Sequence, residues 1–269
     1  MSEILNMPLT EEFLEVILNR QTSKTTIFKH THPFHELYFL VSGKVKYFIT
    51  NEILEANERD LVFVKKNHIH TTAYSGNAER ILISFNDEFL GNEYKEFIKN
   101  CAETKHFVLS SERQDEIEKV VRKLYIEYKN KEENYIFMCK NLLRQLLILM
   151  GREDVTLNKE NLSGTPLVIQ NAAKYITANF GENLTLDTLS KQFAMSPSYF
   201  SKSFKQFTGL GLNEYITAIR IYNAKKLLKD TSLSVTEVAL RCGFNDSNYF
   251  ATVFKKINGV SPKRYSKEK

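Results

Sequence analysis

The sequence of 269 residues contains no tryptophan and little cysteine, proline or glycine. The three cysteines (Cys101, Cys139 and Cys242) are an odd number and widely spaced, which excludes a disulfide scaffold and a cysteine-only zinc site. Ten glycines and five prolines are too few for a low-complexity chain, and 42% hydrophobic residues are enough for packed cores. The length predicts two domains, each able to bury its own core.

Long apolar runs are also missing. The longest, LLRQLLILM at 142–150, contains an arginine and a glutamine and falls short of the roughly 20 residues that cross a bilayer. The first residues, MSEILNMPLTEEF, lack the basic start and apolar core of a signal peptide. We therefore expect a soluble, cytoplasmic protein with no membrane partner.

Charge is distributed unevenly along the chain. Residues 166–269 carry 15 Lys+Arg and 7 Asp+Glu, a net charge of +8, whereas the other 22 and 25 give the first 165 residues −3. This asymmetry predicts a basic module for a polyanion joined to a part with a different task.

Residues 25–85 consist of short segments rich in β-branched and aromatic residues, separated by turns. They predict an antiparallel β-barrel over about 20–108. Apolar residues then take a helical period in SERQDEIEKVVRKLYIEYKN and ENYIFMCKNLLRQLLILM, which predicts two helices within about 110–150. The leucines of the second helix predict a homodimer interface, with packing on the chain's own barrel as the alternative: Leu142, Leu143, Leu146, Leu147 and Leu149.

The predicted fold class is α+β with two domains. GREDVTLNKENLSG at 151–164 has no apolar period and predicts a linker. We expect a sensing and dimerisation domain over 1–150, a linker over 151–165, and an all-α domain over 166–269.

The all-α region repeats itself at an offset of 50 residues. Tyr-Phe at 199–200 recurs at 249–250, and Phe-Lys at 204–205 recurs at 254–255. Each repeat predicts a short helix, a tight turn and a second helix, which is the order of a helix-turn-helix unit.

Residues suited to helix ends mark the boundaries of these helices. Ser196, followed by proline, predicts an N-cap, and Ser234 with Glu237 predicts a capping box. Gly243 suits the left-handed conformation after a helix, and Asp246 suits the cap of the next one.

The second helix of each unit has one apolar and one polar face. The apolar stripes consist of Phe200, Phe204 and Phe207 in unit one, and of Phe250, Phe254 and Ile257 in unit two. Two such polar faces in one basic domain favour insertion into the DNA major groove over a merely solvated surface.

The all-α region resembles a known family of proteins. The segments LTLDTLS at 184–190, MSPSYFS at 195–201, IRIYNAKKLL at 219–228 and VALRCGFNDSNYFATVFKKINGVSPKRY at 238–265 are similar to the double helix-turn-helix domain of AraC/XylS-type bacterial transcription regulators. The resemblance covers roughly 100 residues. It implies two recognition helices in successive major-groove segments about 34 Å apart, joined by a long helix at about 212–229.

The resemblance assigns DNA contacts to two groups of side chains. Base edges are expected to meet Ser198, Ser201, Lys202, Ser247, Asn248 and Thr252. Phosphates are expected to meet Lys205, Lys255 and Lys256. The family often has a basic residue where this chain has Thr252, so the second helix is expected to read fewer bases. Arg220, in the connecting helix, is as consistent with an ion pair as with a DNA contact.

Five of the six histidines fall in two short segments, H30-T-H-P-F-H-E36 and H68-I-H70. With Gly43, the first segment resembles the first cupin motif, and 60–70 resembles the second. The candidate effector-binding residues are His30, His32, Glu36, Tyr38, Tyr47 and His70. In metal-binding cupins the equivalents of His30, His32, Glu36 and His70 hold a divalent cation.

Three hypotheses for this barrel remain open: a metal-free effector site, a bound metal with a sensing or structural role, and histidines that only support the fold. Arg59 stands where the second motif usually has glycine, and Lys65 and Lys66 where proline is frequent, so we expect no metal and no other cofactor.

The function expected from these features is sequence-specific regulation of transcription in response to a small molecule, such as a sugar or related polar metabolite. The expected partners are double-stranded DNA, the effector, a second copy of the chain and RNA polymerase, with the protein acting as an activator and not as an enzyme. The alternatives are a metallo-cupin enzyme fused to a DNA-binding domain and a constitutive regulator with no effector.

Overall fold

A computed structural model describes these parts of the chain: 12–22, 25–30, 32–91, 94, 98, 106–107, 109–152 and 162–267, with the backbone alone at 25–30 and 106–107. The chain divides into two compact units; apart from Thr50–Glu52, which group with the second, the boundary falls between Leu162 and Ser163. Most of the predicted linker lies outside the described residues. None of the described helices is long and apolar enough to cross a membrane.

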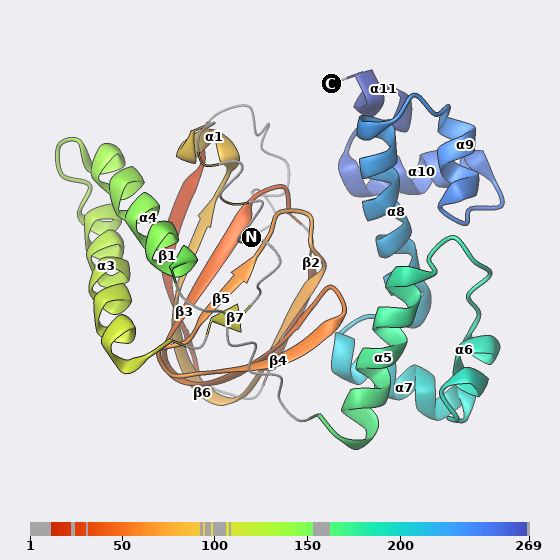
Figure 1. Ribbon diagram of the computed structural model, residues 1–269, viewed down its shortest axis with the longest axis horizontal. Helices are drawn as coiled ribbons and strands as arrows, with labels where there is room; N and C mark the ends of the chain where they lie inside the picture. Colours follow the sequence, from red (N-terminus) through yellow and green to blue (C-terminus); the bar gives the residue numbers. More distant parts are fainter. Residues whose placement is uncertain are drawn as a thin grey trace. The chain divides into compact units, whose positions relative to one another are not determined.

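The first unit is built on one antiparallel sheet (Figure 1). Its strands are β1 (Leu14–Gln21), β2 (Thr25–His30), β3 (His35–Ile49), β4 (Glu52–Asn57), β5 (Leu61–Val64), β6 (His70–Phe85) and β7 (His106–Phe107). Their order is β1-β6-β3-β5-β7, with β2 also paired to β6 and β4 to β3. The sheet starts at Leu14, earlier than the predicted start near residue 20.

The long strands β3 and β6 form the centre of this sheet and pair along their whole length. Their register shifts on both sides of Gly43, where the backbone takes a positive φ of 87°. A Cβ added at Gly43 would lie 2.3 Å from the carbonyl oxygen of Asn77, so only glycine fits this close approach. The two ends of β6 have different neighbours on the side away from β3. Residues Ala78–Phe85 pair with β1, and residues His70–Tyr74 pair with β2.

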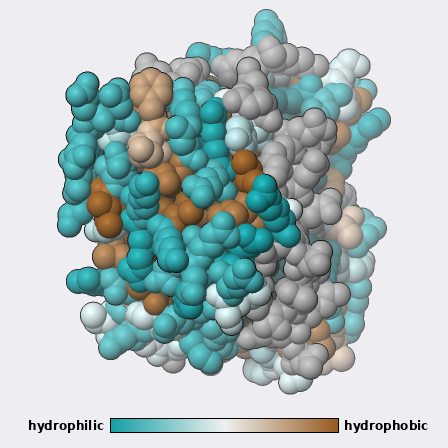
Figure 2. Space-filling model, turned by 60° about the vertical axis from the view of Figure 1, so that its left-hand side comes forward, coloured by the Kyte–Doolittle hydropathy of each residue, from teal (hydrophilic) through white to brown (hydrophobic). Residues whose placement is uncertain are grey.

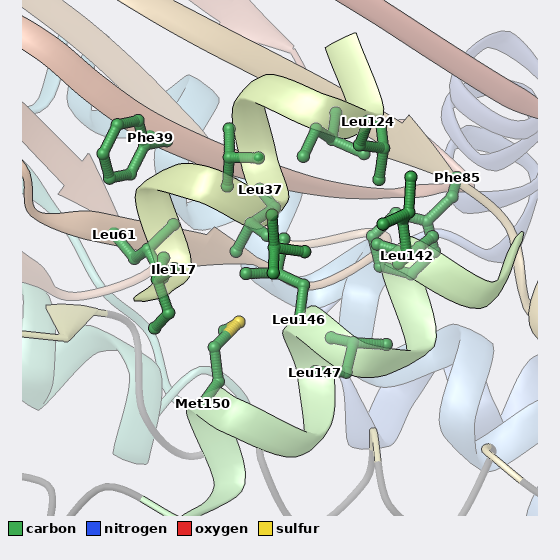
Figure 3. Close-up of a cluster of buried hydrophobic side chains, with 14 of the residues drawn as sticks. Leu37, Phe39, Leu61, Phe85, Ile117, Leu124, Leu142, Leu146, Leu147 and Met150 are labelled. Carbon is green, nitrogen blue, oxygen red and sulfur yellow. The ribbon is translucent and has the colours of Figure 1, made fainter. Parts of the chain in front are cut away.

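Both faces of the sheet are buried. One face packs against the helices α1 (Asp87–Leu90), α3 (Ser111–Asn130) and α4 (Tyr135–Gly151), and Figure 3 shows Leu37, Phe39 and Phe85 of the sheet among leucines of α3 and α4. The opposite face, here called the inner face, has its own cluster: Tyr38, Leu40, Val45, Tyr47, Ile49, Leu54, Ala56, Val62, Val64, Tyr74, Ala78 and Leu82.

The five leucines of α4 that were predicted to form a dimer interface are buried within their own unit. Leu142, Leu143, Leu146, Leu147 and Leu149 are between 0% and 6% exposed. They pack on the sheet and on α3 (Figure 3). That residue assignment is wrong, because these five side chains cover the sheet of their own unit.

From Ser163 onward the described residues of the second unit form helices joined by turns. Its helices are α5 (Gly164–Ala178), α6 (Leu186–Gln192), α7 (Pro197–Thr208), α8 (Leu212–Asp230), α9 (Val235–Arg241), α10 (Ser247–Asn258) and α11 (Pro262–Lys267). The pairs α6–α7 and α9–α10 are the two predicted helix-turn-helix units, and α8 is the predicted connecting helix. The predicted fold class, an antiparallel sheet domain followed by an all-α domain, is therefore confirmed.

Candidate effector site and DNA interface

Three side chains of the predicted effector site meet at one end of the inner face. Glu36 lies on β3, His70 begins β6, and His32 precedes β3. One carboxylate oxygen of Glu36 lies 2.8 Å from His32 Nε2 and 3.1 Å from His70 Nε2. Tyr38, on the same face of β3, donates its hydroxyl to that oxygen at 2.5 Å. The three residues His32, Glu36 and His70 are at most 4% exposed.

Hydrogen bonds on the far side of each ring fix the orientation of both imidazoles. His32 Nδ1 lies 2.7 Å from the carbonyl oxygen of Phe34, and His70 Nδ1 lies 3.2 Å from that of His68. Since a carbonyl oxygen only accepts, each Nδ1 carries the proton, and each Nε2 of a neutral ring offers a lone pair. Those lone pairs point toward Glu36, so a cation bound between the two rings and the carboxylate would satisfy all three groups.

The site therefore fits a divalent metal by its donor chemistry. The ligand atoms of His32, Glu36 and His70 all lie within 4.8 Å of one another. Two imidazole nitrogens and one carboxylate suit zinc, iron, nickel or manganese, and a histidine whose second nitrogen donates to a carbonyl is common around such ions. The side chain of His30, predicted as a fourth ligand, lies outside the described residues; its backbone pairs with His70.

Electrostatics keeps the Glu36 carboxylate ionised. Burial alone would raise the pKa of Glu36, but the close contacts with His32 and His70 outweigh burial and hold that pKa well below its usual range. Burial and the neighbouring Glu36 raise the pKa of Tyr38 well above its ordinary value, so its phenol stays protonated and remains a donor.

A residue that the sequence analysis did not select, Arg80, lies beside this cluster. Its side chain is on the inner face of β6 and is 4% exposed. The guanidinium carbon lies 4.4 Å from the ring centroid of Tyr38 and 5.3 Å from that of Tyr74. Arg80 Nη1 donates to the Tyr47 hydroxyl at 3.3 Å. The two tyrosines predicted as wall residues, Tyr38 and Tyr47, therefore surround a buried cation.

His35, which belongs to the same sequence motif, points to the opposite face of the sheet. It lies between Phe63 and Phe85, and its Nε2 lies 2.8 Å from the carboxylate of Asp87 at the start of α1. Its Nδ1 accepts from the backbone N–H of Lys66. Burial lowers the pKa of His35, and a neutral ring satisfies both contacts. His35 therefore ties the turn before β6 to α1.

The recognition helices α7 and α10 have the predicted ends. Ser196 caps α7, Asp246 caps α10, and the capping box of Ser234 and Glu237 opens α9. Gly243 takes a positive φ of 78°, as predicted.

The candidate DNA contacts lie on the outer sides of these two helices. Exposed side chains are Ser198, Lys202, Lys205, Asn248, Thr252, Lys255 and Lys256, and partly exposed ones are Ser201 and Ser247. Opposite them Phe200, Phe204, Phe250 and Phe254 are fully buried. Ile257 was predicted to share this apolar stripe, but it is 45% exposed at the last turn of α10.

Arg220 has a structural environment that neither predicted alternative describes. Its Nε donates to the carbonyl oxygen of Phe180 at 2.9 Å, and Nη2 donates to that of Glu182 at 2.7 Å. The same guanidinium lies over the ring of Phe244. Arg220 thus joins α8 to the turns after α5 and α9 through carbonyl groups rather than an ion pair.

A sheet domain with a buried polar cluster, followed by two helix-turn-helix units, defines a DNA-binding transcription regulator with a ligand-binding domain. The chain matches the model of the AraC-like ligand binding domain over residues 14–147 and that of a helix-turn-helix domain over 189–268. It belongs to the AraC family of transcription regulators.

Known proteins of this family align with nearly the whole chain. The transcriptional activator RhaR of Mannheimia succiniciproducens is 25% identical over 239 residues, which are 88% of this chain and 86% of the relative. The Msm operon regulatory protein of Streptococcus mutans is 26% identical over 235 residues, covering 86% and 84%. Among solved structures, the C-terminal domain of AraT, a response regulator from Geobacillus stearothermophilus, is 35% identical and covers 41% of this chain and 89% of that one, with a TM-score of 0.38.

Proposed function

We propose that a small polar molecule binds at the inner face of the sheet and controls which DNA sites the helical unit occupies, so that the protein activates transcription. The observation that carries the proposal is the buried cluster of Glu36, His32, His70 and Tyr38 in a chain that also presents two exposed recognition helices. Relatives named as transcriptional activators support the sign of regulation. Control requires that the effector bind one arrangement of the protein more tightly than another.

The test is binding of the full chain to its own upstream DNA and to a scrambled duplex of equal length, at about 0.15 M salt. We expect a preference of roughly a thousandfold or more, which is typical of specific regulators. Transcription with purified RNA polymerase should then rise when the effector is added, and Glu36→Gln should remove that rise while leaving DNA binding in place. Equal binding to both duplexes would contradict the proposal.

We also propose a homodimer, formed by an exposed stripe of α4 rather than by the buried leucines. Phe137 is 68% exposed and Ile148 is 37% exposed, and at eleven residues apart they lie on the same side of the helix. Met138 adds a third exposed apolar side chain. Figure 2 shows apolar surface among polar side chains on this side of the unit.

Phe137→Glu should convert the dimer to a monomer in sedimentation experiments without lowering the melting temperature of the sheet unit, because the side chain is exposed. Arg122→Glu, on an exposed position of α3, is the matched control and should leave the dimer intact.

A bound metal is a second candidate role for His32, Glu36 and His70, favoured by the orientation of both rings. The ion would supply a Lewis-acidic centre that fixes an oxygen of the effector. Elemental analysis of the purified chain tests it: stoichiometric metal in the wild type, lost in His70→Ala, supports the role. We assign no catalytic step to the site, and we place the protein in the cytoplasm, where its DNA and RNA polymerase are.

A further inference from the structure

Arg80 is a buried cation that forms no ion pair with any carboxylate in the described part of the chain. Its guanidinium cannot lose its proton at any physiological pH, and an unpaired charge that is buried destabilises the folded state. In the described part of the chain no carboxylate forms an ion pair with Arg80, and its Nε is buried with no hydrogen-bond partner. Glu36, the nearby carboxylate of the inner face, is already engaged by His32, His70 and Tyr38.

The three tyrosines around Arg80 stabilise the cation only in part. The rings of Tyr38 and Tyr74 make cation–π contacts, and the Tyr47 hydroxyl accepts one hydrogen bond. Burial raises the pKa values of all three phenols, that of Tyr74 to about 12, so none of them becomes an anion near pH 7. Among the described residues, the guanidinium Nε therefore has no acceptor, and no carboxylate neutralises the charge.

Neighbouring side chains also place Arg80 next to the polar cluster. Tyr38 contacts both: its hydroxyl reaches Glu36, and its ring lies against Arg80. A ligand that spans this tyrosine meets a carboxylate and two imidazoles at one end and a planar fork of donors at the other. Carboxylates and phosphates bind such a fork through two parallel hydrogen bonds.

We infer that Arg80 binds a carboxylate or phosphate group of the effector, and that the effector is a hydroxylated organic anion, such as a sugar acid or sugar phosphate, rather than a neutral sugar. This inference rests on the proposed effector site and names its ligand class. The anionic group lies against Arg80, and the hydroxyl groups lie toward Glu36, His32 and His70.

The first arm of the test uses the ligand-free full chain. Arg80→Met removes the charge and keeps the length, so the melting temperature of the sheet unit should rise by about 2 °C or more. Arg20→Met is the matched control, because Arg20 lies on the same sheet, is exposed and pairs with Glu79; it should change little. A lower melting temperature in Arg80→Met would show that the cation supports the fold, and would overturn the inference.

The second arm measures melting temperature and DNA affinity with matched probes: D-glucuronate and D-galacturonate against D-glucose and D-galactose, glucose 6-phosphate, acetate and inorganic phosphate. At least one anion should raise the melting temperature of the wild type while its neutral partner does not. The shift should vanish in Arg80→Met and weaken in Arg80→Lys, which keeps the charge but loses the fork. If only the two uronates raise the melting temperature, the group bound by Arg80 is a carboxylate. If only glucose 6-phosphate raises it, the group is a phosphate.

The inference fails if no anion raises the melting temperature, or if the shift persists in Arg80→Met. A neutral sugar that stabilises the protein and changes its DNA affinity would overturn the inference and leave the proposed function standing. An anion that stabilises the wild type through Arg80 without changing DNA affinity would support the inference and contradict effector control.

Discussion

The two units of this protein place their polar side chains in opposite ways. In the sheet unit Glu36, His70 and Arg80 are at most 4% exposed, whereas Lys202 and Lys255 of the helical unit are exposed. Buried polar groups are coupled to packing and to each other, but exposed ones are not. If DNA and effector bind where we propose, the DNA preference can change by surface substitutions alone, whereas the ligand preference cannot change without affecting the stability of the sheet.

The largest expected effect is on the core of the helical unit. Phe254→Ala removes a fully buried ring between α10 and α8 and should destabilise that unit by about 3–5 kcal/mol, with loss of DNA binding. Calorimetry of the full chain should show the transition of the sheet unit unchanged. Ile257→Ala, three residues later and exposed, should change stability by no more than about 0.5 kcal/mol. A shift of both transitions by Phe254→Ala would mean that the units do not unfold independently.

Gly43→Ala should lower the free energy of unfolding of the sheet unit by roughly 2–4 kcal/mol. The substitution adds strain at a positive φ and a clash with the carbonyl of Asn77. Ligand binding should be lost and the transition of the helical unit retained. Gly76→Ala is the control on the same sheet, since a Cβ there meets no atom within 4 Å. Equal stability of the two variants in urea titrations would refute the close approach at Gly43.

Among the exposed residues of the helical unit, Lys202→Ala should reduce the difference in binding free energy between the preferred and other base pairs at one operator position by about 1–3 kcal/mol. Thermal stability should stay unchanged. Lys255→Ala should weaken binding to all sequences and reduce the slope of affinity against salt by about one, because one phosphate contact is lost. Binding measured on a set of single-base operator variants at several salt concentrations separates the two roles. Uniform losses with Lys202→Ala would make it a phosphate contact.

The smallest effect concerns pH. Contacts with His35 and Lys66 outweigh burial and lower the pKa of Asp87 below its ordinary value. A lowered pKa stabilises the folded state above the unfolded value near 3.9, and that stability is lost as pH falls through the folded pKa. Asp87→Asn should therefore destabilise the sheet unit by about 1 kcal/mol at pH 7, and the difference from wild type should shrink below about pH 4.

The control for this prediction is Asp115→Asn, whose carboxylate is exposed and pairs with Arg59 on the surface. Such pairs contribute little, so its urea midpoint should stay near that of the wild type. A difference for Asp87→Asn that remained constant down to pH 2 would show that packing, not charge, is responsible.

Features set by neighbouring residues in the chain could be predicted from the sequence. The caps at Ser196, Ser234 and Asp246 and the left-handed Gly243 depend on contacts within three or four residues, and all of them are present. The shared face of Glu36 and Tyr38 follows from strand alternation and is also confirmed.

Features that depend on which surfaces meet could not be predicted in this way. Both faces of the sheet are buried, so alternation of polar and apolar residues along β6 does not reveal which side chains are buried. Arg80, between Glu79 and Ile81, therefore has the sequence pattern of an exposed residue. The leucines of α4 have the same spacing whether they cover a sheet or a partner helix. The base contacts of α7 and α10 and the identity of the effector stay predictions.

The pairing of β1 with β6 sets an order of events during synthesis. Leu14 pairs with Phe85, so the first strand has no partner until a segment 71 residues later has left the ribosome. At about 5–20 residues per second this delay is roughly 4–14 s, during which an apolar strand edge is open to other chains. The helices of the second unit form their backbone hydrogen bonds within four residues and have no such waiting period. A nascent chain is therefore most in need of a chaperone before its ligand-binding unit closes.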